Sequence, residues 1–336
     1  MFLLTMIIRA LGVALLAVVL FTACVKWRAS LQNSDATLPR LLPLPETGSL
    51  SSAKDLERFR FVVFGDAMET PRPSATIQTI FRNIRDMDPR PAFAISLGDI
   101  IEGEPTEPID TQKISRALHT FLDVARVGAV PVFNAAGNHE LDDVDDIPSA
   151  RMLRIYEQVI GPAYGSFDYG NSHFIALNSS EVPPPGTKPP PKRTTGQMEQ
   201  EFSYISPRQI SQLTADLEAN RDKAHVFVAM HYPLKPLTAD DRLYPGHTAR
   251  ELIELFAKYP NVSYVLAAHE HLYYNPQDSS NLTHVPAYIA GEPTRYLVSG
   301  GAGAPIWVKP DEGGFHHYLI FQVDGPRVTV ALKRLP

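Results

Sequence analysis

The sequence predicts an α/β domain with parallel strands, and two observations lead to this class. From Phe59 onwards, short apolar runs with the length of buried strands alternate with longer amphipathic stretches. The longer stretches carry apolar residues at helical spacing. Strands that alternate with helices in this way are typical of a sheet built from crossover connections, in which neighbouring strands run parallel.

The first part of the domain contains three predicted strands and two predicted helices. From Thr76 to Met87, the residues Ile77, Ile80, Phe81 and Ile84 share one helical face. The other elements here are the strands Phe61 to Phe64, Pro91 to Leu97 and Val130 to Asn134, and the helix Ile114 to Val127. Their order along the chain is β-α-β-α-β.

The middle of the chain has a different character. Gly165 to Leu177 predicts a hairpin with Gly170-Asn171 at its turn. Glu181 to Thr195 is rich in proline and predicts an irregular surface loop, whose Lys188, Lys192 and Arg193 could meet an anionic substrate. The remaining predicted elements are the helices Ser206 to Asn220 and Thr248 to Lys258, the strands Val226 to Met230 and Val262 to Ala267, and several antiparallel strands from Tyr296 to Leu335.

Composition excludes some classes of partner and of metal site. Lys and Arg number 31 against 37 Asp and Glu, and no long basic run appears, so no nucleic-acid partner is expected. Cys24 is the only cysteine, which excludes an intrachain disulfide and a thiolate metal cluster. A metal would therefore bind to histidine, carboxylate and amide groups, which suit Zn, Mn, Fe or Mg.

Residues 1–24 predict a targeting segment, because Arg9 precedes an uncharged apolar stretch of signal-peptide length. Its end, Leu20-Phe21-Thr22-Ala23-Cys24, resembles a bacterial lipoprotein processing site, in which the cysteine becomes the lipidated first residue. An uncleaved anchor helix from Phe2 to Val25 and a simply cleaved signal peptide are the alternatives. We expect an exported protein, periplasmic or at the cell surface, held at the membrane through Cys24 or the N-terminal helix. Residues 25–58 predict a linker, and 59–336 one domain.

Five polar segments each lie just after a predicted buried strand. In α/β sheets, ligands bind outside the carboxyl ends of the strands, so these segments are expected to meet. Each alone is commonly a turn or a helix cap. Together they supply two Asp, one Asn and four His, which is a set of metal ligands. The segments are Gly65-Asp66, Gly98-Asp99, Gly137-Asn138-His139-Glu140, His231-Tyr232-Pro233 and His269-Glu270-His271.

With these segments in this order, the sequence resembles the calcineurin-like metallophosphoesterase family, within the purple-acid-phosphatase-like superfamily. The resemblance extends from Phe61 to His271, and Tyr296 to Gly303 is similar to the family's late strand and glycine turn. Gly137-Asn138-His139-Glu140 is its most specific part. The resemblance implies two mixed β-sheets packed as a sandwich and flanked by helices, in four layers.

The resemblance also implies a role for each polar residue. Asp99 would bridge two metal ions, and His139 would face the substrate rather than a metal. Mn, Fe or Zn ions, one or two per chain, would be the cofactors. The remaining ligands would be Asn138, His231 and His269 on one ion, and Asp66 and His271 on the other.

The implied activity is hydrolysis of a small phosphorylated substrate, a mono- or diester, by a metal-activated hydroxide. Asp99 and His139 would be the catalytic residues, since a protonated His139 can donate to the leaving oxygen. Glu140 either orients His139 or is simply a carboxylate at a helix start. Tyr232, Tyr273 and Tyr274 lie beside ligands, where they either line the pocket or pack at its rim.

The sequence departs from the family pattern at one ligand position. Where the family has Asp-x-His, this chain has Asp66-Ala67-Met68, and a thioether is a poor ligand for these ions. The ion at Asp66 and His271 would then be loosely held, or completed by water, Glu69 or Glu102. Ala268 in place of a glycine is a milder change.

Two other classes of function remain open at this point. The first is a catalytically inactive relative that binds metal without turnover. The second is an amidohydrolase-type metallohydrolase, a class that usually carries its His-x-His on the first strand. Here His269 and His271 follow most of the other candidate ligands, which disfavours the second class.

Overall fold

The computed structural model describes residues 37–50, 56–68, 74–103, 109–143, 147–187, 203–237, 249–277 and 285–336. The predicted targeting segment and Cys24 lie outside this part of the chain, as do Glu69 and the three basic residues of the proline-rich loop. Within it, no helix is both long enough and apolar enough to cross a membrane.

Two mixed sheets of six strands each form the centre of the molecule. Sheet 1 has the order β3-β2-β1-β11-β12-β9 and contains β1 (Arg58–Phe64), β2 (Phe93–Ser96), β3 (Val132–Asn134), β9 (Val285–Ile289), β11 (His317–Asp324) and β12 (Arg327–Arg334). Sheet 2 has the order β4-β5-β6-β7-β10-β8 and contains β4 (Gly165–Tyr169), β5 (Ser172–Ala176), β6 (His225–Ala229), β7 (Val262–Ala267), β8 (Tyr273–Tyr274) and β10 (Arg295–Ser299).

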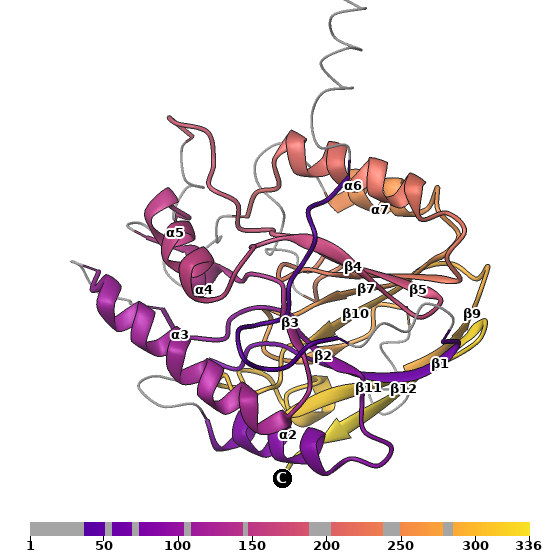
Figure 1. Cartoon of the computed structure of the whole chain (residues 1–336), viewed down its shortest axis with the longest axis horizontal. Coiled ribbons are helices and arrows are strands. Elements are labelled where there is room, and N and C mark those ends of the chain that lie inside the picture. Colours follow the sequence, from indigo (N-terminus) through magenta and orange to yellow (C-terminus); the bar gives the residue numbers. More distant parts are fainter. Residues whose placement is uncertain are drawn as a thin grey trace, which may run out of the picture.

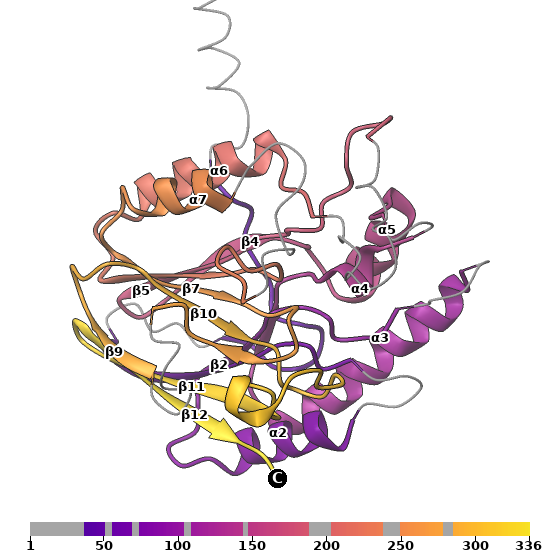
Figure 2. The same cartoon turned by 180° about the vertical axis from the view of Figure 1, so that it is seen from behind.

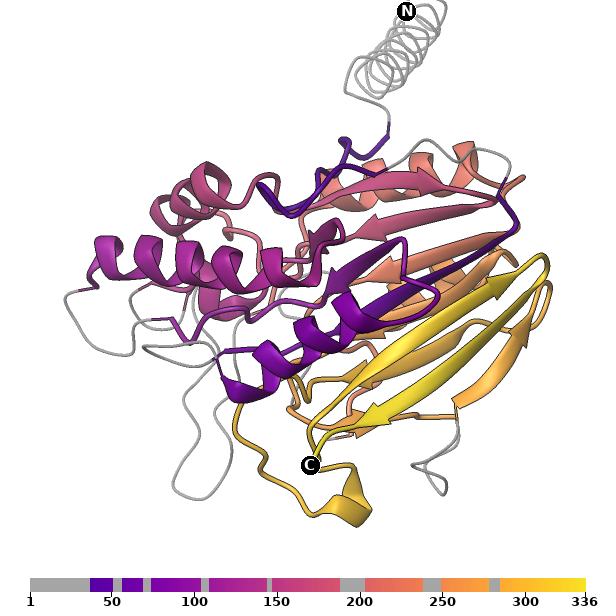
Figure 3. The same ribbon diagram turned by 60° about the horizontal axis from the view of Figure 1, so that its bottom comes forward.

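Helices cover the outer face of each sheet, which gives four layers (Figures 1 and 2). Figure 3 shows α2 along the outer face of sheet 1, while α6 and α7 lie over sheet 2. The described helices are α2 (Ala75–Asp86), α3 (Thr111–Ala125), η1 (Arg126–Gly128), α4 (Asn138–Leu141), α5 (Ala150–Val159), α6 (Pro207–Ala219), α7 (Ala249–Phe256) and η3 (Pro310–Glu312). The sandwich predicted through the family resemblance is confirmed.

Alternation along the strands explains why the sheets stack. In β1, Phe61 and Val63 belong to the core between the sheets, whereas Val62 and Phe64 belong to the core beneath the helices on sheet 1. The core between the sheets is aromatic: the Phe61 ring centroid lies 5.4 Å from that of Phe93. Successive strand residues point to opposite faces, so a continuous apolar run buries both faces of its sheet.

Most predicted elements are confirmed within a few residues, including the hairpin of β4 and β5 with Gly170 at its turn. The tail differs from the prediction. β11 and β12 do pair antiparallel. β10, however, pairs parallel with β7 and so belongs to sheet 2. On its other side β10 pairs antiparallel with β8, so the expectation of antiparallel strands holds there only in part. The periodicity of Tyr296 to Ser299 indicates a strand but not its partners.

Residues 37–50 also differ from the predicted linker over 25–58. Leu38, Leu41 and Leu44 are buried, and the backbone of this segment bonds to both sheets. The Leu41 N–H donates to Ser166 O at 2.9 Å, and the Leu44 N–H donates to Val132 O at 2.6 Å. The segment therefore packs across the edge strands β3 and β4, because leucines set three residues apart have apolar surface to bury.

A buried histidine joins the β4–β5 hairpin to α6. His173 Nδ1 lies 2.7 Å from Asp168 Oδ1, and its Nε2 lies 2.8 Å from Asp216 Oδ2. Burial lowers the pKa of His173, but the hydrogen bonds to Asp168 and Asp216 outweigh it and raise the pKa above its ordinary value. The side-chain hydrogen bond from His173 is also the main reason that the pKa of Asp168 falls to about 2. The doubly protonated ring is thus the form that the fold stabilises.

We expect His173→Gln to lower the free energy of unfolding by about 1–3 kcal/mol at pH 6. Because the folded-state pKa of His173 is raised, its contribution is fully present below the unfolded pKa and disappears as the pH rises through the folded value. The difference between wild type and variant should therefore shrink between pH 6 and pH 9. Urea unfolding at several pH values measures it, and a difference that grows with pH would contradict the assignment.

Candidate metal centre

The candidate ligands lie at one end of the sandwich, on loops that follow central strands of both sheets. Backbone hydrogen bonds join these loops. The Asp66 N–H donates to Gly98 O at 3.1 Å, and the Ala268 N–H donates to His231 O at 2.9 Å. The His269 N–H also donates to Asp66 Oδ1 at 3.2 Å, so the loops after β1 and β2 and those after β6 and β7 form one continuous rim.

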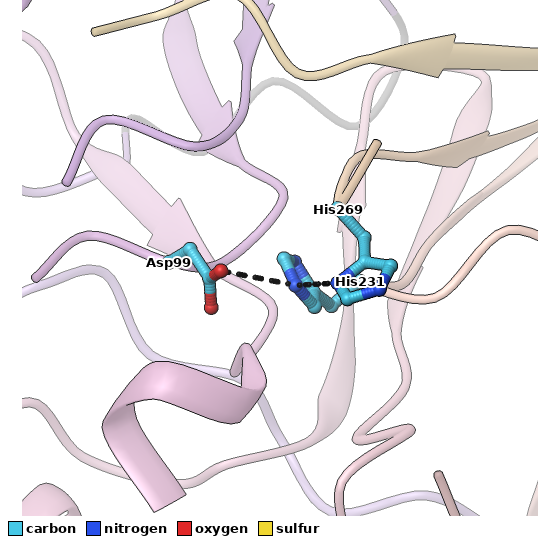
Figure 4. A group of neighbouring side chains, drawn as sticks. All are labelled: Asp99, His231 and His269. Atoms are coloured by element: carbon cyan, nitrogen blue, oxygen red, sulfur yellow. Dashed lines mark hydrogen bonds and ion pairs between the residues drawn. The ribbon is translucent and has the colours of Figure 1, made fainter. Parts of the chain in front are cut away.

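The first cluster consists of Asp99, His231 and His269, whose ligand atoms all lie within 4.8 Å of one another. His231 Nε2 lies 3.3 Å from Asp99 Oδ2 and 3.2 Å from His269 Nδ1 (Figure 4). Asp99 comes from sheet 1 and the two histidines from sheet 2. The sandwich thus brings together ligands that are far apart in the sequence.

The second cluster shares a residue with the first. It consists of Asp66, Asp99 and His271, again with ligand atoms within 4.8 Å of one another. Asp99 is therefore the one residue common to both clusters of the described chain, and it is almost completely buried. A carboxylate has two oxygens and can contact two cations at once, so its position suits a bridging role.

The second cluster also contains a buried carboxylate oxygen whose hydrogen-bonding capacity is unsatisfied among the described residues. Asp66 is fully buried, and its Oδ2 has no hydrogen-bond partner among the described residues. A Cβ at Gly300 would lie 2.0 Å from this oxygen, so only glycine leaves room for it there. An uncompensated buried carboxylate oxygen is costly, and a bound cation would compensate it. The donor set of carboxylates and imidazoles fits a divalent metal.

Backbone conformation sets the candidate ligands apart from the rest of the chain. Six non-glycine residues in the described part have positive φ, and four of them are Asp66, Asp99, His269 and His271. Their φ values lie between 48° and 71°, in the left-handed region that L-residues seldom occupy. Such strain persists where the surrounding structure imposes it, and it is concentrated at functional sites.

Backbone carbonyls fix the orientation of two of the histidine rings. His231 Nδ1 lies 2.9 Å from Leu97 O, and His271 Nδ1 lies 2.9 Å from Pro305 O. With Nδ1–H donating to the carbonyl, each ring presents its Nε2 lone pair to the site. Metal-binding histidines are typically held in this way by their second nitrogen.

The electrostatics of the clusters favour positive charge. Burial raises the pKa of Asp99, but His231, His139 and His269 outweigh it and hold the pKa below its usual range. Burial lowers the pKa of His231, yet the charge of Asp99 and its hydrogen bond raise it to about 9. Two buried carboxylates thus attract either a proton on the imidazole or a bound cation, which compete for the same position.

The segment Gly137-Asn138-His139 wraps around the shared carboxylate. The His139 N–H donates to Asp99 Oδ1 at 3.1 Å, and a Cβ at Gly137 would lie only 2.1 Å from that oxygen. Asn138 is buried, and its Nδ2 donates to Asp142 Oδ2 at 3.3 Å, which orients its amide. His139 Nδ1 lies 2.5 Å from Glu102 O, and its Nε2 lies 3.7 Å from Asp99 Oδ2. The side chain of His139 is 31% exposed.

Comparison with known proteins agrees with this geometry. Residues 59–273, well over half of the chain, match the family model described as calcineurin-like phosphoesterase. The chain belongs to the calcineurin-like phosphoesterase family. The resemblance read from its motifs is thereby confirmed.

A relative and two solved structures show how far the similarity extends. The human serine/threonine-protein phosphatase CPPED1 is 27% identical over 193 residues, which cover 56% of this chain and 56% of that protein. The chain thus matches little more than half the length of this relative. A zebrafish (Danio rerio) dimetal phosphatase has a TM-score of 0.55 at 17% identity, covering 83% of this chain and 99% of its own. PhoD has a TM-score of 0.54 at 12% identity, covering 86% and 73%. At these identities the two structures show a shared fold.

Glu140, the last residue of the segment Gly137-Asn138-His139-Glu140, connects two loops through its carboxylate. Its carboxylate is fully buried and accepts hydrogen bonds from the backbone N–H groups of Ile100 at 2.6 Å, Gly137 at 2.9 Å and Asp99 at 3.3 Å. Burial, with the charge of Asp99, raises its pKa to about 7. Glu140 therefore fixes the Asp99 loop against the start of α4.

We expect Glu140→Ala to lower the free energy of unfolding by about 3 kcal/mol or more, since buried N–H groups lose their acceptor. Glu254→Ala, on the exposed face of α7, is the matched control and should change stability by less than about 0.5 kcal/mol. Chemical denaturation of both variants measures the difference. Equal stability of the two variants would rule out this role for Glu140.

Met68, the departure from the family pattern, is buried. Of its suggested substitutes, Glu102 is exposed and belongs to neither cluster, and its backbone oxygen contacts His139. The tyrosines also differ in role. Tyr232 packs its ring 4.2 Å from that of His269, whereas Tyr273 is fully buried.

Sequence reasoning missed how the loop after β10 borders the centre. The Ala302 N–H donates to Gly65 O at 3.0 Å and the Ala304 N–H to Asp66 O at 2.8 Å, while Pro305 O holds His271. The glycine turn noted at Tyr296 to Gly303 was the available signal. It did not indicate that the residues beyond the turn, up to Trp307, would reach His271.

Proposed function

We propose that the protein hydrolyses phosphate mono- or diesters at a centre with two metal positions. Asp99, Asn138, His231 and His269 would hold one cation, and Asp66, Asp99 and His271 the other. The observation that carries this proposal is the buried Asp99 carboxylate shared by two ligand clusters. Family membership supports the reaction class, and the two clusters support the arrangement.

Each residue has a separate task in this proposal. The carboxylates of Asp66 and Asp99 supply the negative charge that the bound form requires, in a site from which water is largely excluded. The carbonyl of Glu102 fixes the ring of His139, so that Nε2 can carry a proton towards the leaving oxygen. When bound, divalent cations such as Mn, Fe or Zn would supply Lewis-acid polarisation of the phosphoryl group and water activated at neutral pH.

The first experiment measures hydrolysis of p-nitrophenyl phosphate and bis-p-nitrophenyl phosphate with Mn, Zn, Fe and Co in turn. We expect turnover with at least one metal and its loss on treatment with a chelator. The ratio of the two rates separates a monoesterase from a diesterase. No turnover with any metal would favour the alternative of an inactive metal-binding relative. Family membership removes the support for an amidohydrolase.

The two cations are expected to bind with different strength. The cluster of Asp66, Asp99 and His271 lacks the histidine that Met68 replaces, whereas the other cluster keeps all of its candidate ligands. Metal analysis after extensive dialysis should therefore find about one equivalent retained per chain, and a second only in excess metal. Two equivalents that survive dialysis would contradict the weakened position. Met68→His should raise the number retained.

We further propose that the protein is exported and held at the membrane through Cys24 or the N-terminal helix. The support is the sequence of residues 1–24. Metabolic labelling with a fatty acid should label wild type but not Cys24→Ala if the cysteine is lipidated. Absent label, with the protein still in the membrane fraction, indicates an anchor helix instead.

A further inference from the structure

The most exposed large hydrophobic side chain of the described residues lies next to the candidate metal centre. Trp307 is 75% exposed, and its ring centroid lies 6.4 Å from that of His271, with the two planes only 23° apart. Single exposed hydrophobic side chains are common on protein surfaces. A tryptophan whose ring runs nearly parallel to that of a candidate ligand is a more specific arrangement.

The loop that carries Trp307 is fixed on both sides. Before it, Ala302 and Ala304 donate backbone hydrogen bonds to the Asp66 segment, and Pro305 O contacts His271. After it, the Gly314 N–H donates to Lys309 O at 2.9 Å, next to the short helix η3. The indole is thus held at the rim although almost nothing covers it, and pre-organised groups lose little entropy when they bind a ligand.

The indole N–H of Trp307 and the carbonyl of Pro305 both contact the same ring nitrogen of His271. The indole nitrogen lies 3.0 Å from His271 Nδ1, but the same Nδ1 lies 2.9 Å from Pro305 O. When Nδ1–H donates to Pro305 O, as the metal-binding orientation requires, the ring nitrogen cannot accept from Trp307. The indole is then positioned by its loop and leaves both its face and its N–H to a ligand.

We propose that Trp307 is a specificity-determining residue whose indole face stacks on a planar aromatic part of the leaving group. This inference rests on the proposed function and names the substrate class: phosphoesters of an aryl alcohol or of a nucleoside. A phosphate group held by the buried clusters has to extend its leaving group outwards, and Trp307 is an exposed aromatic side chain beside the candidate ligand His271. Stacked aromatic pairs have centroids about 4.5–7 Å apart, so a planar leaving group at this distance from the exposed indole would gain a stacking contact.

The test uses binding, so that it does not depend on turnover. Calorimetry with the metal-loaded protein compares phenylphosphonate with methylphosphonate, and adenosine 5′-monophosphate with ribose 5-phosphate. Wild type should prefer the aromatic member of at least one pair about 5- to 100-fold, as expected for stacking on an aromatic side chain. The pair that shows the preference distinguishes an aryl from a nucleoside source. The preference should disappear in Trp307→Ala and return in Trp307→Phe.

The control is Ile289→Ala, which removes another exposed hydrophobic side chain, on the edge strand β9, and should leave all four affinities unchanged. Equal affinity of wild type for both members of each pair would overturn the inference. An equal loss of all four ligands in Trp307→Ala would also overturn it and would indicate that Trp307 only supports His271. Selective binding without hydrolysis would instead contradict the proposed function and leave Trp307 as a specificity residue.

Discussion

Replacement of Asp99 by Asn is expected to lower kcat/KM for phosphate esters about 1000-fold or more and to reduce the bound metal. Asp99 belongs to both ligand clusters, so one substitution removes charge from two cation positions. The amide keeps the shape of the side chain and one oxygen, but it cannot supply the negative charge that two cations share. Other candidate ligands serve one cluster each, and their replacement should cost less.

Because asparagine has nearly the same shape as aspartate, Asp99→Asn distinguishes a loss of catalysis from a loss of folding. Asp99 is buried, and asparagine in its place removes a desolvated charge without creating a cavity. Circular dichroism should therefore show a folded protein, while metal analysis and turnover both fall. Asp123→Asn, at an exposed position of α3, is the matched control. An Asp99→Asn protein that keeps its metal and its activity within about tenfold would be incompatible with a bridging carboxylate.

Much of the site could be predicted because its residues stand at fixed points of the fold. Asp66, Asp99 and Asn138 each come shortly after a buried strand, and parallel strands bring their carboxyl ends to one edge. Two features could not be predicted. The motif spacing does not reveal that four candidate ligands adopt positive φ. The sequence around Glu140 does not reveal that its carboxylate accepts hydrogen bonds from the backbone of a loop some 40 residues earlier.

The parts of the fold that differed from prediction depend on contacts between distant segments. Leu38, Leu41 and Leu44 stand among prolines and polar residues, so locally they are typical of a tether. Only the edge strands β3 and β4 provide a surface on which they become buried. In the same way, the sequence of β10 fits either sheet, and its parallel pairing with β7 is decided by the path of the chain.

The position of Trp307 beside the candidate metal centre could not be predicted from the sequence either. Nothing near it in the sequence marks a functional residue, because Ile306-Trp307-Val308 is a short apolar run that could belong to a strand. Its significance comes from the loop after β10, which returns to the Asp66 segment and brings the indole beside His271. Specificity residues on loops commonly escape motif reasoning, since loops vary in sequence while the scaffold positions them.

His139→Ala is expected to lower kcat about 100- to 10,000-fold while the metal content stays unchanged. His139 belongs to neither ligand cluster, and its ring is held by Glu102 O and partly exposed. Loss of the His139 imidazole should therefore slow the reaction and leave the metal content unchanged. His119→Ala, an exposed histidine of α3, is the matched control and should leave kcat unchanged.

The leaving group separates the two roles open to His139. A proton donor matters most for an alkoxide, which needs protonation to leave, and least for p-nitrophenolate, which leaves readily as an anion. His139→Ala should thus impair hydrolysis of an alkyl phosphate more than that of p-nitrophenyl phosphate. Equal impairment would mean that His139 stabilises charge on the phosphoryl oxygens. If the metal content falls as well, His139 acts on the centre through the Asp99 carboxylate that its backbone N–H contacts at 3.1 Å.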